Sequence, residues 1–92
     1  MRKENFMNWL EIFTSLSLRT IEAYAGAIST VSKGLKKYNL IEGSLYNLQS
    51  STELETLILK YFSISEFIQK DSRGNKMYSN ALKYYKKYLE AL

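Results

Sequence analysis

Basic and polar residues recur at helical spacing near the C-terminal end of the sequence. Lys76, Asn80, Lys83 and Lys87 follow one another at intervals of four, three and four residues, which places them on one face of a helix. Lysine cations neutralise phosphates, and asparagine can bond a phosphate oxygen or a base edge. Tyr84 flanks this face, where its ring could lie against a sugar or a base. The pattern predicts contact with double-stranded DNA, but it is equally typical of a solvated lysine face.

Two expected helix starts place a cation beside free backbone N–H groups. They are segment 17–20, Ser-Leu-Arg-Thr, and segment 73–76, Arg-Gly-Asn-Lys. A helix N-terminus is a natural place for an anion, so the two starts could straddle a duplex backbone if the fold brings them to one side. The alternative is two ordinary capped helices. Taken with the basic face, the candidate DNA contacts are Arg19, Thr20, Arg73, Asn75, Lys76, Asn80, Lys83, Tyr84 and Lys87.

Residues of the types that usually catalyse reactions or bind metals are scarce in this sequence. The chain has no cysteine and no histidine, so zinc lacks its preferred ligands and there is no Cys–His or Ser–His–Asp cluster. Gly74 stands alone, without a glycine-rich phosphate loop, and Glu53 and Glu55 would face different sides of a helix. We therefore expect no catalytic residue, no metal and no cofactor in this domain taken by itself. Without disulfides, a secretory signal or a membrane span, a cytoplasmic protein is the default expectation.

Length and charge indicate a single basic domain. The chain has 92 residues, 46% of them hydrophobic, which suffices for one core but not two. Of the net charge of +4, residues 1–40 carry +3, residues 41–59 carry −3 and residues 60–92 carry +4, so we expect a positive side. The chain stops at Leu92 without a Gly or Asn cap, which favours an N-terminal module of a larger protein over a native C-terminal helix.

The elements that would position these residues are all helical. Proline is absent, and apolar residues follow three-and-four spacing in nearly every segment. Ser17, Ser50 and Ser63 are the expected N-caps, and Gly43 marks a turn with one short helical turn after it. Segment 70–75 is the clearest expected loop. The expected helices cover about 4–14, 18–37, 51–62, 64–69 and 75–92, which gives an all-α, compact bundle of four to five helices.

The second expected helix has an unusual outer face of small residues: Ala23, Gly26, Ser29 and Thr30. Glycine costs about 1 kcal/mol in a helix interior, so we expect something to pack closely at Gly26. A neighbouring helix of the same domain is the preferred interpretation, and a ligand or partner is the alternative. Among the tyrosines, the apolar faces predict a core position, with the hydroxyl at the rim, for Tyr24, Tyr61, Tyr78 and Tyr85.

Two segments resemble known families. Residues 17–24, Ser-Leu-Arg-Thr-Ile-Glu-Ala-Tyr, are similar to the Ser-x-x-Thr-hydrophobic-x-x-Tyr opening of the SAM-like core-binding domain of tyrosine recombinases, which is phage integrase-like. Residues 74–89, Gly-Asn-Lys-Met-Tyr-Ser-Asn-Ala-Leu-Lys-Tyr-Tyr-Lys-Lys-Tyr-Leu, look like the final helix of that domain. They resemble more closely a Gly-x-x-x-Tyr-Ser-x-Ala-Leu-x-x-Tyr-x-x-(Phe/Tyr)-Leu segment in accessory helical domains of some bacterial restriction endonucleases.

The resemblance implies a four- or five-helix domain that clasps DNA next to a separate catalytic domain. The integrase catalytic residues lie outside such a domain, so none is carried over to this chain. The second helix departs from the pattern because its small-residue face is less basic than that of a typical DNA-reading helix. Two hypotheses result: a DNA-binding accessory domain that contacts mainly the phosphate backbone, and a protein-interaction or dimerisation domain.

Overall fold

The computed structural model describes residues 2–92, and this part of the chain folds entirely into helices and their connections. The elements are α1 (Arg2–Phe13), α2 (Leu18–Lys37), the 3-10 turn η1 (Leu45–Asn47), α3 (Ser51–Tyr61), α4 (Ser65–Arg73) and α5 (Met77–Glu90). No residue from 2 to 92 forms a β-strand. The prediction of an all-α bundle of four to five helices is confirmed.

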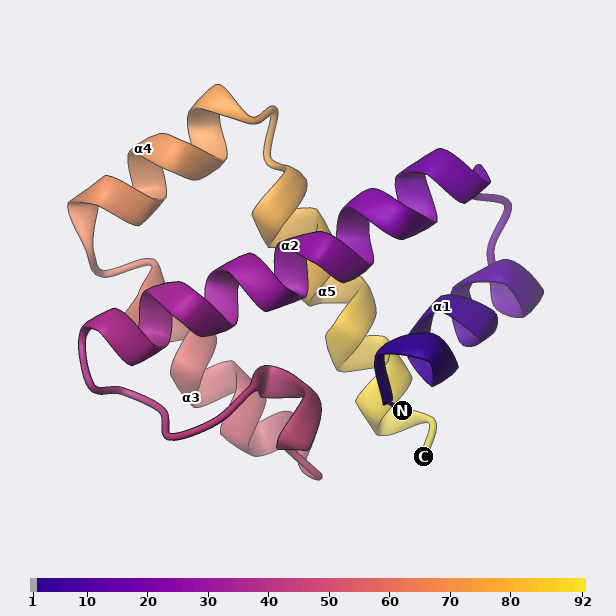
Figure 1. Ribbon diagram of the computed structural model, residues 1–92, viewed down its shortest axis with the longest axis horizontal. Helices are drawn as coiled ribbons and strands as arrows, with labels where there is room; N and C mark the ends of the chain where they lie inside the picture. Colours follow the sequence, from indigo (N-terminus) through magenta and orange to yellow (C-terminus); the bar gives the residue numbers. More distant parts are fainter. Residues whose placement is uncertain (1) are drawn as a thin grey trace.

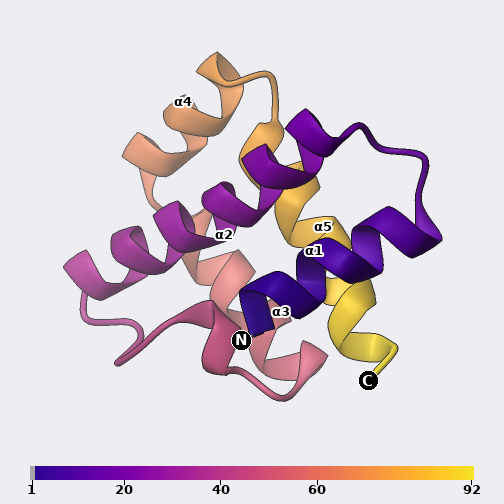
Figure 2. The ribbon, with the colours of Figure 1, turned by 45° about the vertical axis from the view of Figure 1, so that its right-hand side comes forward.

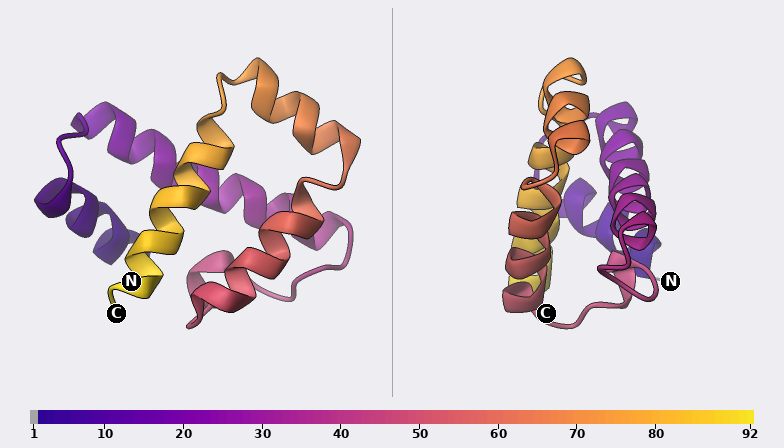
Figure 3. Two further views of the ribbon diagram at one scale, coloured as in Figure 1. Left: turned by 180° about the vertical axis from the view of Figure 1, so that it is seen from behind. Right: turned by 90° about the vertical axis from the view of Figure 1, so that its left-hand side faces the viewer.

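The helices lie in two layers. Helices α1 and α2 form one layer, and α3, α4 and α5 form the other (Figure 3). Helix α2 crosses α5 near the middle of both helices, and α1 lies beside the lower half of α5 (Figures 1 and 2). No helix among residues 2–92 is long and apolar enough to cross a bilayer.

Helix α2 is the central element, and both of its ends are fixed by local hydrogen bonds. The Ser17 hydroxyl accepts from the Thr20 N–H at 3.2 Å, which confirms the predicted N-cap. At the other end, Asn39 adopts the left-handed conformation with φ 57°, and the Leu40 N–H donates to the Leu35 carbonyl at 2.9 Å. The apolar residues buried along α2 are Ile21, Ala25, Ala27, Ile28, Val31 and Leu35.

A buried hydrogen-bond chain holds η1 between α2 and α5. The Ser32 hydroxyl accepts from the Leu45 N–H at 2.9 Å and donates to the Ile28 carbonyl at 2.9 Å. The Tyr85 hydroxyl donates to the Leu45 carbonyl at 2.9 Å. Burial raises the pKa of Tyr85 because the phenolate would lose its hydration, so the hydroxyl stays a donor. The side-chain hydroxyls thus provide hydrogen-bond partners for the buried N–H and carbonyl of Leu45, which no regular α-helix provides in this segment.

The edge between α1 and α2 differs from the sequence-based prediction. Phe6 packs edge-on against Tyr85, with ring centroids 5.1 Å apart, as expected of a core face. Helical spacing places Phe13 and Leu18 on the apolar faces of the first two expected helices, which predicts that they point inward. They are instead 68% and 64% exposed, and their neighbour Ile12 is 72% exposed. Both mispredicted residues stand at helix ends, where the helical face no longer lies over the core.

Close packing at a glycine occurs in α2, but not at the predicted position. A Cβ built at Gly26 would meet nothing within 4 Å, so the prediction of a neighbouring helix there is wrong. At Gly34 a Cβ would lie 2.8 Å from Phe67 Cζ and 3.1 Å from Tyr61 Cε1. Those two rings stack at 4.2 Å with an interplanar angle of 7°. The missing side chain of Gly34 is what lets α4 approach α2.

Around α3 and α4, one predicted cap is confirmed, and the other predicted boundaries differ from the structure. The Ser50 hydroxyl accepts from the N–H groups of Thr52 and Glu53, which confirms the predicted cap of α3. The predicted cap at Ser63 is wrong, because Ile64 is the N-cap of α4 and makes no side-chain cap bond. The prediction of a loop over 70–75 is also wrong in its first part, since α4 continues to Arg73. The last helix starts at Met77, two residues later than predicted.

Candidate nucleic-acid interface

Three of the predicted DNA contacts share the exposed side of α5. Asn80, Lys83 and Lys87 are exposed, while the opposite side of the helix is buried. The buried residues of that side are Ala81, Leu82, Tyr85, Tyr88 and Leu89. We refer to Asn80, Lys83 and Lys87 as the lysine face. Because its polar groups come from successive turns of one helix, their spacing follows the helix axis.

The cations of the lysine face are free of carboxylate partners. Among residues 2–92, Lys83 and Lys87 form no ion pair, whereas Lys86 of the same helix pairs with Glu55 of α3. The hydrogen bond from Lys86 to Glu55 raises the pKa of Lys86, and the negative charge of the Glu55 carboxylate partly offsets its positive charge. The unpaired positive charge of α5 is therefore concentrated on the lysine face.

Tyr84 borders the lysine face and is held by a residue from α2. Its ring stacks on that of Tyr24, with centroids 5.6 Å apart and an interplanar angle of 29°. The Lys87 Nζ lies 5.5 Å from the Tyr84 centroid, within the range of a cation–π contact. Burial, and then the neighbouring Tyr84, raise the pKa of Tyr24 above its ordinary value. We refer to Tyr24 and Tyr84 as the tyrosine pair.

The α4–α5 turn contributes a second group of predicted contacts. Arg73 is exposed and its Nε donates to the Gln69 carbonyl at 3.4 Å. Asn75 and Lys76 both take the left-handed conformation, with φ 56° and 64°. Asn75 closes the end of α4, because the Lys76 N–H donates to the Asp71 carbonyl at 2.8 Å. Asn75 and Lys76 therefore turn the chain, Arg73 ends α4, and none of the three is part of α5.

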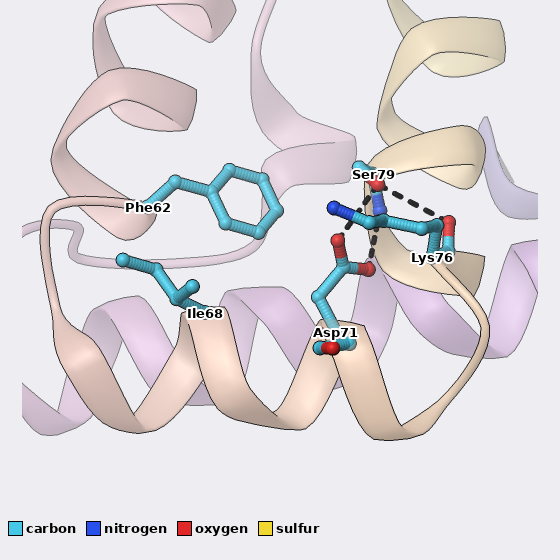
Figure 4. Close-up of a pocket in the computed structure, with 6 residues that line it drawn as sticks. Phe62, Ile68, Asp71, Lys76 and Ser79 are labelled. Atoms are coloured by element: carbon cyan, nitrogen blue, oxygen red, sulfur yellow. Dashed lines mark hydrogen bonds between the residues drawn. The ribbon is translucent and has the colours of Figure 1, made fainter.

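The side chain of Lys76 also points in another direction than predicted, since it does not share a helix face with Asn80, Lys83 and Lys87. It precedes α5, and its side chain extends along a cavity of about 460 Å³ between α4 and α5. Figure 4 shows its ammonium end pointing into the space between Phe62 and Asp71, with Ser79 behind. The basic face of the helix is thus shorter than the sequence predicted, and it begins at Asn80.

Arg19 and Thr20 lie at the start of α2. Arg19 is exposed. The Thr20 hydroxyl accepts from the Ser17 hydroxyl at 3.0 Å, so it takes part in the cap. Thr20 precedes Tyr24 by one turn, which places it on the flank of α2 that leads to the tyrosine pair. The starts of α2 and α5 lie along the same upper edge in Figure 1, but in different layers.

The structure therefore divides the predicted residues into three groups, on α5, at the end of α4 with the following turn, and at the start of α2, and it adds one residue. Asn80, Lys83, Tyr84 and Lys87 form a continuous strip on α5, and the α4–α5 turn lies beyond the start of that helix. Tyr24, expected in the core, is the addition. Its signals in the sequence are a place on an apolar face and the last position of the motif over residues 17–24, and no local pattern pairs it with a residue of the last helix.

Comparison with known proteins yields no relative. No protein-family model, no curated protein and no solved structure matches the chain. Among residues 2–92, there is also no group of three or more His, Cys, Asp or Glu side chains arranged to hold a metal ion. The interface must be interpreted from its own chemistry.

Proposed function

We propose that this chain is a DNA-binding accessory domain of a DNA-processing protein, and that it contacts double-stranded DNA mainly through the phosphate backbone. The observation that carries the proposal is the lysine face. Lys83 and Lys87 are exposed, lie one turn apart and have no carboxylate partner among residues 2–92. Cations in this state release counterions from DNA when they bind phosphates, which is the main source of sequence-independent affinity.

The neighbours of the lysine face support the same proposal. Asn80 adds a side chain that can donate to a phosphate oxygen, and Tyr84 is kept in place by Tyr24. The motif resemblance to integrase-like core-binding domains and to accessory domains of restriction endonucleases agrees with a DNA-contacting role. In such proteins the chemistry belongs to a separate domain, so we propose that this domain binds and does not catalyse.

A duplex titration at two salt concentrations tests the proposal. We expect binding of a fluorescein-labelled duplex to be measurable by anisotropy at 50 mM salt and to fall steeply at 200 mM salt. Undetectable binding at low salt, or affinity that does not depend on salt, would contradict the proposal.

A charge-matched pair of variants locates the contact. Lys83→Glu with Lys87→Glu should remove most of the affinity and lower the slope of log K against log salt by about 2, since each phosphate contact contributes about 0.9. The control is Lys33→Glu with Lys36→Glu, which changes the net charge equally at two exposed lysines of α2. Equal losses in both variants would mean that only net charge matters and would exclude α5 as the contact.

Two observations favour a second candidate function, dimerisation. Gly26 has no neighbour within 4 Å of a built Cβ, which leaves the small-residue face of α2 open. Ile12, Phe13 and Leu18 expose apolar surface at the junction of α1 and α2. Sedimentation velocity over a range of protein concentrations tests this function. Self-association that Gly26→Leu abolishes, and that the lysine-face variant leaves unchanged, would support it.

A further inference from the structure

The tyrosine pair has an exposure that sets it apart from the core aromatics. Tyr61 and Tyr85 are 1% and 0% exposed, whereas Tyr24 and Tyr84 are only partly buried. The pair seals the edge of the contact between α2 and α5 and also borders solvent. The pair therefore reaches solvent in part, at the border of the lysine face.

The pair is also preformed. Tyr24 is anchored in α2, which has 20 residues, and Tyr84 in α5, which has 14 residues. These two helices cross at the centre of the core (Figure 1), so the relative position of the rings is set by the fold. A ligand that stacks on such a surface pays little for ordering side chains.

The positive charge beside the tyrosine pair favours a ligand that carries phosphates. Lys87 lies 5.5 Å from the Tyr84 centroid, and Lys83 lies one turn away on the same helix. Tyr84 lies between Lys83 and Lys87 along α5, so a strand whose phosphates contact both lysines passes beside its ring. Inside an intact duplex, the faces of the bases are already covered by their neighbours. Only an unpaired base offers a free face, and every base does so, whatever the sequence.

We propose that the tyrosine pair stacks an unpaired nucleobase, so that the domain prefers single-stranded DNA, or a duplex with an unpaired position, over an intact duplex. The inference rests on the proposed function, since the lysine face is taken to hold the phosphates. It extends that function by naming the DNA form that the site takes and by assigning a binding role to Tyr24.

The test uses a fluorescent base as the probe. Two duplexes of the same sequence carry one 2-aminopurine, paired in the first and in a single-nucleotide bulge in the second. On adding the wild-type protein, we expect the fluorescence of the bulged probe to be quenched by stacking and that of the paired probe to change little. We also expect the bulged duplex to bind roughly 5- to 150-fold more tightly, the range for one base stacked on an aromatic ring.

Variants separate ring stacking from hydrogen bonding. Tyr84→Leu should weaken binding of the bulged duplex far more than binding of the intact duplex and so remove the preference for the bulge, while Tyr84→Phe, which keeps the ring, should retain the preference. Tyr38→Leu, at an exposed tyrosine near the C-terminal end of α2, is the control and should retain it as well. Circular dichroism checks that each variant is folded, and the wild-type quenching needs no variant.

The possible failures are distinguishable. Salt-dependent duplex binding through Lys83 and Lys87, without quenching or preference for the bulge, would overturn the stacking inference and leave the proposed function standing. Loss of the preference in Tyr84→Phe would overturn it in favour of a hydroxyl contact. Absence of binding to any of the DNA forms would overturn both.

Discussion

The carboxylate of Asp71 accepts two hydrogen bonds from Ser79, one from the backbone N–H at 3.0 Å and one from the hydroxyl at 2.8 Å. Ser79 lies in the first turn of α5, whose N-cap residue Lys76 makes no side-chain cap bond. Asp71, which is 4% exposed, therefore caps α5 from the end of α4. A carboxylate at this position also interacts favourably with the positive end of the helix dipole.

Asp71→Ala should lower the free energy of unfolding by about 2 kcal/mol, because it leaves the first turn of α5 without its acceptor in a buried position. Urea unfolding monitored by circular dichroism measures the change. Ser72→Ala, at the exposed neighbouring residue, should stay within about 0.5 kcal/mol of the wild type. An unchanged unfolding midpoint in Asp71→Ala would show that water replaces the carboxylate without loss.

The two helical glycines of α2 should respond to alanine in opposite directions. Gly34→Ala forces a Cβ to within 2.8 Å of Phe67 Cζ, and the ring is fixed by its stacking on Tyr61. We expect a loss of about 1–3 kcal/mol, the usual range for overpacking. Gly26→Ala meets no atom and should stabilise by about 0.5–1 kcal/mol through helix propensity. Thermal unfolding of both variants measures the two changes in stability. A change in the same direction for both variants would contradict the packing described at Gly34 and Gly26.

Alkaline pH should weaken the fold through its buried tyrosines. Burial, and to a lesser degree neighbouring Tyr78, Asp71 and Glu66, raise the pKa of Tyr61 from 10.0 to about 12. A raised pKa in the folded state means that the unfolded chain loses the proton first. The stabilising contribution is thus complete below pH 10 and is lost as pH rises toward 12.

Tyr61→Phe removes this titration and should make the fall of the urea midpoint between pH 9 and pH 11.5 less steep. Wild type and variant share all other tyrosines and lysines, so the difference between their slopes isolates Tyr61. Parallel slopes would indicate that the Tyr61 hydroxyl reaches solvent in the folded protein.

Releasing Lys86 from Glu55 should strengthen DNA binding. Glu55→Gln removes the carboxylate and adds one unit of free positive charge beside the lysine face. We expect about a two- to fivefold higher affinity at 50 mM salt and a steeper salt dependence, in line with about one further phosphate contact. Stability should change little, because Glu55 is exposed to solvent and Lys86 is only half-buried. Lower affinity in Glu55→Gln would mean that the pair positions α5 for binding.

The local features of this fold could be predicted from the sequence. Ser17 and Ser50 were recognised as caps because a cap bonds N–H groups two or three residues away. The apolar period of α2 and α5 similarly reveals their buried faces. Two local predictions, the cap at Ser63 and the loop from residue 70, are wrong, and the other features that were missed join distant elements. Asp71 reaches Ser79 across a turn, and its polar surroundings predicted a loop.

In the candidate site, too, the arrangement within one helix could be predicted from the sequence, and the contacts between helices could not. Helical spacing alone places Asn80, Lys83 and Lys87 on one face, and the structure gives that placement. Spacing cannot show that Lys86 is neutralised by Glu55 or that Tyr24 reaches Tyr84, because both depend on how separate helices pack. The same limit explains why close packing was expected at Gly26 and lies elsewhere in α2.

The tyrosine pair links two distant parts of the chain, since Tyr24 belongs to α2 and Tyr84 to the last helix. The surface that the two rings share exists only while α2 and α5 are packed together. DNA bound there selects the folded state and should raise the midpoint of thermal unfolding as its concentration increases. An isolated peptide of residues 77–90 would keep its lysines but not this surface. Affinity for DNA would then report the integrity of the whole domain as well as the charge of a single helix.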